Sequence, residues 1–192
     1  MEYSLERLIK EIDKGIHHDY LFFWGHTQKK ESLIDKSCFS QWFPSPFTVD
    51  GIVYPTAEHW MMAKKAELFN DNKIVKEILA TEKPAVAKEL GRKVSNFDAE
   101  KWNASSYKIV VEGNKQKFSQ NEKLKTFLLH TGSKVLVEAS PADAVWGIGL
   151  SQSDADALNP LTWKGNNLLG FALMEVRNFL NNNNGQTIKT YQ

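Results

Sequence analysis

The stretch Tyr54-Pro-Thr-Ala-Glu-His59 decides the fold, because it opens a helix that carries charged side chains among apolar ones. Thr56 follows a proline and is a favourable N-cap residue, so we expect this helix to begin near Ala57. At about 100° per residue, three side chains lie within roughly 40° of Glu58 on one helix face: Met62, Lys65 and Phe69. Soluble proteins normally turn Glu and Lys outward, since an unpaired buried charge is costly. The face therefore predicts a polar pocket cut into an apolar core.

Outward from this helix, hydrophobic periodicity predicts a chain in which helices outnumber strands and do not alternate with them. We expect further helices over 4–16, 72–81, 84–90, 103–118, 121–130 and 167–180, and strands over 20–24 and 134–138. A hairpin over 49–54 turns at Asp50-Gly51. Gly91 and Gly132 are expected to end the helices before them. This pattern indicates an α+β fold, mainly helical, in a single compact domain with a small β component, and not a doubly wound sheet.

The bulk composition excludes several classes of protein. The 192 residues suit one globular domain, and a net charge of +1 offers no broad nucleic-acid footprint, although a local basic patch stays open. Cys38 is the single cysteine, which excludes an intramolecular disulfide. The charged N-terminus lacks a signal-peptide core, and no apolar run approaches about 18 residues, so we expect a cytoplasmic protein without membrane contact. No spacing of His, Cys and carboxylates resembles a metal site, and no cofactor is expected.

A set of short blocks follows in order along the chain. They are Phe-Pro-Ser-Pro-Phe (43–47), Tyr-Pro-Thr-Ala-Glu-His (54–59), Leu-Gly-Arg (90–92), Trp102, Lys117-Phe118, Asp143 with Trp146-Gly-Ile-Gly149, Trp163-Lys-Gly-Asn-Asn-Leu-Leu-Gly170 and Leu173-Met-Glu-Val-Arg177. Together they resemble the YbiA-like proteins of the NADAR superfamily over residues 20–180. Residues 1–19 then form an N-terminal helical extension, and 181–192 a flexible tail. One departure is Ser40-Gln41-Trp42, where the family often has Ser-Asn-Phe.

The resemblance implies an N-glycosidase. Members similar to YbiA cleave the C–N bond of phosphoribosylamino-pyrimidine intermediates of riboflavin synthesis, and other members remove ADP-ribose from guanine bases of nucleic acids. The family's functional glutamate, tryptophan and aspartate correspond here to Glu58, Trp102 and Asp143. Lys65 corresponds to a helix lysine that is implicated in some members, through a Schiff base with the opened ribose.

The chemistry of this bond gives the candidates definite roles. Cleavage passes through an oxocarbenium-like ribose, so the site must stabilise a cation, protonate the leaving nitrogen and aim a nucleophile. Glu58 near a helix N-terminus is favoured in its ionised form and suits a base or a cation stabiliser. Asp143, in a loop with Gly and Trp, could bind ribose hydroxyls or polarise water. Lys65, with a pKa lowered by its pocket, could instead trap the open-chain aldehyde as an imine.

Each candidate also has a structural interpretation. Glu58 can complement the helix dipole, Lys65 can form a surface ion pair, Trp102 can pack in the core and Asp143 can cap a turn. Arg92, at a helix end, can meet the dipole or bind a phosphate with its planar fork. We expect Arg92, Trp102 and Trp146 to bind the substrate.

Three functions compete on this basis. The leading one is hydrolysis of a small phosphorylated N-riboside, because a polynucleotide substrate usually requires a basic surface. The second is removal of ADP-ribose from nucleic acid, and the third is binding of ADP-ribose or NAD without turnover.

Overall fold

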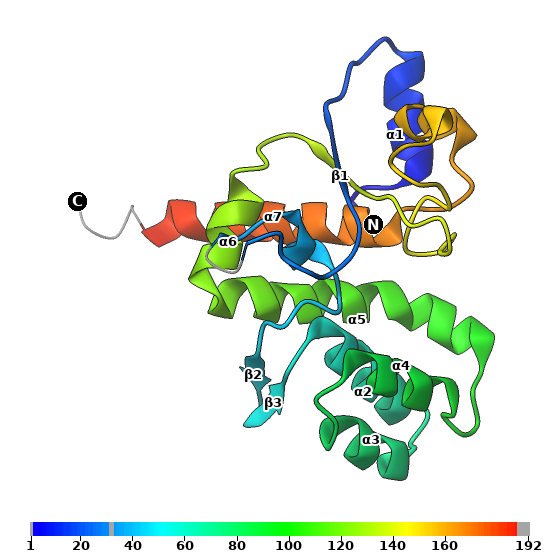
Figure 1. Cartoon of the computed structure of the whole chain (residues 1–192), viewed down its shortest axis with the longest axis vertical. Coiled ribbons are helices and arrows are strands. Elements are labelled where there is room, and N and C mark those ends of the chain that lie inside the picture. Colours follow the sequence, from blue (N-terminus) through cyan, green and yellow to red (C-terminus); the bar gives the residue numbers. More distant parts are fainter. Residues whose placement is uncertain (1, 31–32, 188–192) are drawn as a thin grey trace. The chain divides into compact units, whose positions relative to one another are not determined.

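The computed structural model describes residues 2–30 and 33–187, with side chains up to residue 183, as a mainly helical chain (Figure 1). Its helices are α1 Leu5–Asp13, α2 Ala57–Leu68, α3 Asn72–Leu79, α4 Pro84–Arg92, α5 Ala99–Gln120, α6 Glu122–Leu129 and α7 Leu168–Thr187. Its strands are β1 Tyr20–Phe23, β2 Phe47–Val49, β3 Ile52–Tyr54 and β4 Val135–Glu138. Short 3-10 helices cover Lys36–Phe39, Ala155–Leu158 and Pro160–Thr162. The predicted α+β class, mainly helical with a small β component, is confirmed.

The chain forms two compact units, Met1–Phe39 with Lys123–Gln192, and Ser40–Glu122. In the first unit β1 and β4 pair in parallel, with Tyr20 opposite Val135. The start of α7 is held against β4 by the side chain of Asn167. Asn167 Oδ1 accepts a hydrogen bond from Glu138 N at 2.9 Å, and its Nδ2 donates to Leu136 O at 2.9 Å. Among the described residues, no helix has both the length and the apolar character needed to cross a membrane.

The second unit is built around α2, which packs against α3, α4 and α5. Before it, the antiparallel hairpin β2–β3 turns at Asp50 (φ 51°) and Gly51 (φ 78°), as predicted. These two positive φ angles give the turn that matches the twist of a two-stranded ribbon. Trp60 of α2 packs against α5 at Gly113, where a Cβ atom would collide with the indole ring. Helix α2, which carries the candidate residues Glu58 and Lys65, is therefore buried on most sides.

Two sequence predictions about local breaks are wrong. Gly91 does not end its helix: α4 continues to Arg92, and a Cβ at Gly91 would collide with Sδ of Met62. The glycine is needed for close approach of α4 to α2, and not for a turn. Trp24 is not part of the buried strand, because the chain turns at Gly25 (φ 79°) and leaves the indole 64% exposed.

Helix lengths also differ from the prediction at several ends. α1 is shorter, and α5 begins at Ala99 because Asp98 caps it by accepting a hydrogen bond from Lys101 N. α7 runs through the asparagine run to Thr187, beyond the predicted helix end at Leu180. Asparagine is a weak helix former, but extending an existing helix costs far less than nucleating one. The remainder of the predicted tail, 188–192, lies outside the described residues.

Candidate active site

Glu58 lies in the first turn of α2 and is only 5% exposed. Thr56 caps this helix as predicted, with its Oγ1 accepting from His59 N at 3.4 Å. The neighbouring His59 is fully buried, and its Nδ1 lies 2.8 Å from Thr56 Oγ1. Burial lowers the pKa of His59, which favours its neutral form and a structural role. Glu58 is therefore a carboxylate held inside the protein at the positive end of a helix, and not a solvated residue of the first turn.

A two-residue segment, Ser40-Gln41, connects the first turn of α2 to the middle of α5. Gln41 O accepts a hydrogen bond from Glu58 N at 2.9 Å. From α5, Lys117 Nζ donates to Ser40 O at 2.9 Å, and Asn114 Nδ2 donates to Gln41 Oε1 at 2.8 Å. Asn114 and Lys117 are both completely buried. Ser40 O thus binds the buried ammonium of Lys117, and Gln41 O binds the first turn of α2, which carries Glu58.

Two buried polar atoms of this network have no hydrogen-bond partner in the described part of the chain, namely Gln41 Nε2 and Asn114 Oδ1. Buried polar atoms are nearly always hydrogen-bonded, so such a pair needs an explanation. One atom donates and the other accepts, which is the combination that a hydroxyl group can satisfy. They lie beside the turn that carries Glu58, because Gln41 O accepts the hydrogen bond from Glu58 N.

Lys65 lies two turns further along α2 and is half-buried among aromatic rings. Its Nζ is 4.3 Å from the ring centroid of Phe97 and 5.4 Å from that of Trp102. Burial, and to a smaller extent the charge of Arg92, lower the pKa of Lys65. This is the direction that a nucleophilic amine requires. Arg92 is the last residue of α4, two residues beyond the predicted end of this helix, and it is exposed.

The sequence analysis missed three residues of this unit. Asn114 and Phe97 were not singled out, and Lys117 was noted only as part of a motif. Asn114 and Lys117 are polar residues three positions apart in a long helix, which is a weak signal for one buried face. Phe97 follows Asn96 (φ 54°) in an irregular loop and is 48% exposed, so no periodicity could place it beside Lys65.

The predicted site residues divide between the two units. Glu58, Lys65, Arg92 and Trp102 belong to Ser40–Glu122, whereas Asp143 and Trp146 belong to the other unit. Asp143 Oδ1 accepts from Val145 N at 2.9 Å and from Trp146 N at 2.8 Å, so the carboxylate caps its own turn. Both of these hydrogen bonds are accepted by the same carboxylate oxygen of Asp143, Oδ1. The partnership of Asp143 with Glu58 and the binding role of Trp146 stay predictions.

Neither a metal nor a cofactor site stands out in the part of the chain that the structure describes. No group of three or more His, Cys, Asp or Glu side chains is placed there to hold a metal ion. The groups that the unit Ser40–Glu122 brings together are a carboxylate, an amine, amides and aromatic rings.

Comparison with known proteins gives consistent matches. A model of the NADAR domain matches residues 22–181. The N-glycosidase of Acanthamoeba polyphaga mimivirus is 44% identical over 163 residues, which cover 82% of this chain and 94% of the relative. N-glycosidase YbiA of Escherichia coli is 35% identical over 143 residues, 74% of this chain and 79% of the relative. The solution structure of E. coli YbiA superimposes with a TM-score of 0.70 at 30% identity, covering 88% of this chain and 89% of that one.

Proposed function

The chain belongs to the NADAR domain family and is an N-glycosidase, and we propose that its substrate is a small phosphorylated N-riboside. The phosphoribosylamino-pyrimidines of riboflavin synthesis are the leading candidates. The observation that carries this proposal is the buried Glu58 carboxylate with Gln41 Nε2 and Asn114 Oδ1 near its helix turn. A ribose needs such a combination: a negative charge beside its anomeric carbon, and groups that bind its hydroxyls.

In the direct mechanism, Glu58 stabilises the oxocarbenium-like ribose or takes a proton from the attacking water. The bond between C1 and the nitrogen breaks, its electron pair leaves with the nitrogen, and that nitrogen takes a proton. Water supplies the oxygen on C1, so the products are the free amine and a ribose phosphate. Asp143 is the second carboxylate that this scheme proposes.

In the alternative mechanism, the neutral amine of Lys65 attacks C1 of the ring-opened sugar and displaces the substrate amine. The resulting imine is then hydrolysed by water, which regenerates Lys65 and releases the sugar. The lowered pKa of Lys65 and the aromatic rings around its amine support this route. Arg92 would bind the phosphate with its planar fork, and Trp102 would stack against the pyrimidine ring.

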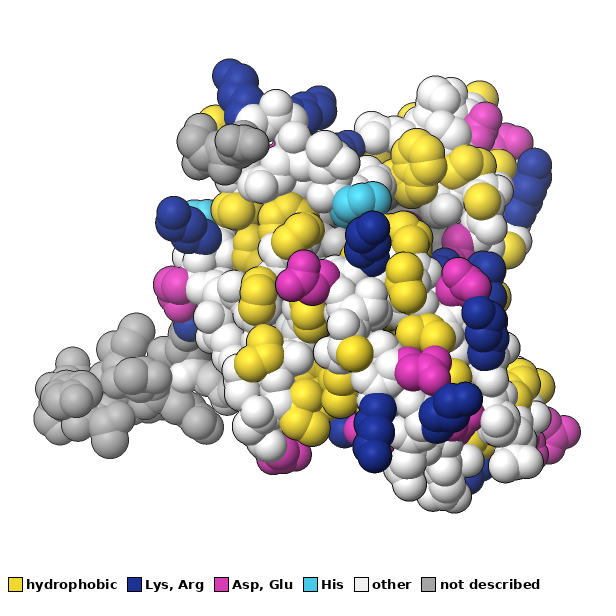
Figure 2. Space-filling view, turned by 60° about the horizontal axis from the view of Figure 1, so that its bottom comes forward, with side chains coloured by type: hydrophobic (Ala, Val, Ile, Leu, Met, Phe, Trp, Pro, Cys, Tyr) yellow, Lys and Arg dark blue, Asp and Glu magenta, His cyan; other side chains and the backbone are white. Residues whose placement is uncertain are grey.

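The surroundings of Lys65 also favour a second candidate substrate, an ADP-ribosylated guanine. Phe97 is 48% exposed and lies next to Trp102 and the Lys65 ammonium, a combination that can stack on a base. One observation argues against a long nucleic acid as the substrate. On the face drawn in Figure 2, Lys and Arg side chains are interspersed with Asp and Glu and form no continuous basic surface. The small metabolite therefore remains the first choice.

Product analysis by mass spectrometry tests this proposal. The pure protein is incubated separately with 5-amino-6-(phosphoribosylamino)uracil and with ADP-ribosyl-guanosine. We expect ribose 5-phosphate from the first substrate. If only ADP-ribosyl-guanosine is cleaved, with release of ADP-ribose, the protein is instead an enzyme that reverses nucleic-acid ADP-ribosylation. If neither compound is cleaved, both proposed substrates are refuted.

A pair of variants on α2 links turnover to the site. We expect Glu58→Gln to lower kcat by about 100-fold or more, the range of a positioned acid–base group. Glu67→Gln is the matched control, because Glu67 forms an ion pair with Lys64 at 2.7 Å on the same helix. Equal activity of the two variants would exclude Glu58 as the working carboxylate.

A further inference from the structure

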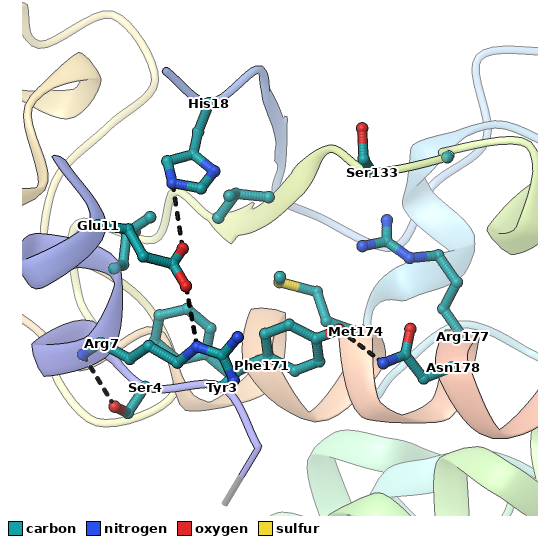
Figure 3. A pocket seen from close by; sticks show the side chains of 13 residues that line it. Tyr3, Ser4, Arg7, Glu11, His18, Ser133, Phe171, Met174, Arg177 and Asn178 are labelled. Atoms are coloured by element: carbon teal, nitrogen blue, oxygen red, sulfur yellow. Dashed lines mark hydrogen bonds and ion pairs between the residues drawn. The ribbon is translucent and has the colours of Figure 1, made fainter. Parts of the chain in front are cut away.

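A pocket lies in the unit that does not carry Glu58 (Figure 3). Its volume is about 330 Å³, near the lower end of the range for small-molecule sites. Helix α1, helix α7 and the loop between α6 and β4 supply its walls. Because α1 precedes the residues that match the NADAR domain, 22–181, this pocket combines family and non-family segments. Its lining includes Tyr3, Leu8, Glu11, Phe171, Met174 and Arg177.

The inner surface of the pocket is mainly apolar. Leu8 of α1 and Phe171 and Met174 of α7 are at most 5% exposed, and all three line it. Tyr3 fixes the entrance, because its hydroxyl accepts a hydrogen bond from Asn178 Nδ2 at 2.6 Å. These side chains would enclose a single ring or a short apolar chain.

Arg177 is the unusual group in this pocket, since it is a cation only 3% exposed. Its Nη1 donates to Thr131 Oγ1 at 2.7 Å and to Lys134 O at 2.9 Å, which are both neutral acceptors. Among the described residues, no carboxylate forms an ion pair with Arg177. Buried arginines are normally paired with an anion, and burial here lowers the pKa of Arg177.

The other charges of the pocket are already committed to one another. Glu11 lies 2.9 Å from Arg7 Nε and 3.2 Å from His18 Nε2, and Figure 3 shows this chain of contacts on the wall opposite Arg177. Among the residues that line the pocket there are two guanidinium groups and one carboxylate, and that carboxylate, Glu11, pairs with Arg7 and not with Arg177.

The remaining donors of Arg177 define the shape of the missing partner. Both recorded bonds use Nη1, which leaves the edge formed by Nε and Nη2 without a recorded partner in the described part of the chain. That edge presents two parallel N–H groups, the arrangement that binds a planar carboxylate in a bidentate manner. An apolar cavity that ends in such a fork matches a molecule with a ring at one end and a carboxylate at the other.

We propose that this pocket is a binding site for a small aromatic carboxylate, with the ring against Phe171 and Met174 and the carboxylate on Arg177. The site is separate from the candidate glycosidase residues, because its lining includes none of Glu58, Lys65 and Asp143 and none of the proposed substrate-binding residues. It gives the N-terminal helix α1 a function, since α1 forms one wall of the site.

Calorimetric titration of the full chain tests the proposal, with benzoate and phenylacetate as probes and benzyl alcohol as the uncharged comparison. We expect one carboxylate per chain, bound at least about tenfold more tightly than the alcohol, because a hydrogen-bonded ion pair is the main polar contact. Arg177→Gln should remove that preference. Lys10→Gln, on the exposed face of α1 outside the pocket, should leave it unchanged.

A second variant covers the case in which Arg177→Gln does not fold. Ser133 is exposed at the rim of the pocket, so Ser133→Trp should block entry of the probe while Arg177 stays intact. The proposal is refuted if neither carboxylate binds to the wild-type chain, if the alcohol binds equally well, or if a folded Ser133→Trp chain binds the probes as before. This titration measures binding of the probes and not turnover of N-ribosides. A failure of the binding proposal is therefore distinguishable from a failure of the proposed glycosidase activity.

Discussion

Replacing Asn114 by leucine separates stability from catalysis at the candidate active site. The side chains have nearly the same size, and position 114 is completely buried. Leucine removes two hydrogen bonds from Asn114 Nδ2, to Gln41 Oε1 at 2.8 Å and to Val110 O at 2.9 Å. At about 1 kcal/mol each, these bonds represent about 2 kcal/mol of stability.

The same substitution also removes a cost. Asn114 Oδ1 is buried without a hydrogen-bond partner in the described structure, and such an atom costs about 1–3 kcal/mol. These two contributions nearly cancel, but the variant also leaves Gln41 Oε1 without its donor, so we expect the free energy of unfolding to fall by about 1–3 kcal/mol. For a chain of this size, that corresponds to a loss of about 2–12 °C in Tm. Activity should also fall, because Oδ1 is one of the groups that we propose to bind the ribose.

The assay is thermal unfolding by calorimetry together with kcat/KM on the phosphoribosylamino-pyrimidine. We expect kcat/KM of Asn114→Leu to fall by about tenfold or more, which corresponds to about 1.4 kcal/mol of lost transition-state binding. Asn121→Leu is the matched control on α5, since Asn121 Nδ2 also makes two bonds, to Pro46 O and Lys117 O. It should lower Tm and leave kcat/KM unchanged. A large loss of stability in Asn114→Leu with unchanged kcat/KM would refute the reasoning.

Four further predictions concern the lysine, its neighbour Arg92, the core and metals. If Lys65 forms an imine, borohydride added during turnover will attach a ribosyl group to Lys65, and a turnover without that mass shift would favour direct attack by water. Arg92→Gln removes a charge that lowers the pKa of Lys65, so the rise of kcat with pH should move to higher pH; a shift to lower pH would contradict this route. Gly113→Ala places a Cβ against Trp60 and should lower the free energy of unfolding by about 1–3 kcal/mol in calorimetry, and an unchanged Tm would show that the indole moves aside freely. A chelator should leave turnover unchanged, and strong inhibition would contradict the metal-free scheme.

The sequence predicted the elements whose causes are local. Thr56 caps α2, and Asp50-Gly51 turns the hairpin, because both depend on the backbone conformation of a few neighbouring residues. Periodicity placed Glu58 and Lys65 on one face of α2, and the structure agrees that this face is at least half-buried. The fold class followed from the order of these elements.

The same local rules misread Gly91, where the glycine serves the approach of two helices. They also could not identify Phe97 or Asn114, because a loop aromatic and a mid-helix amide become part of a site only through contacts with other segments. Gln41 was visible in the sequence as a departure from the family, but its hydrogen bonds with Glu58 and Asn114 were not.

By itself, then, the sequence determined the helices, the hairpin, the family resemblance and the candidate carboxylates and amine. Only the tertiary structure decided which polar atoms are buried, which lack partners, and which rings surround Lys65. The physical reason is that caps, turns and periodicity act over a few residues, whereas burial depends on segments far apart in the chain. Asn114 meets Gln41 across 73 residues and Arg177 meets Thr131 across 46, and no local pattern encodes those distances.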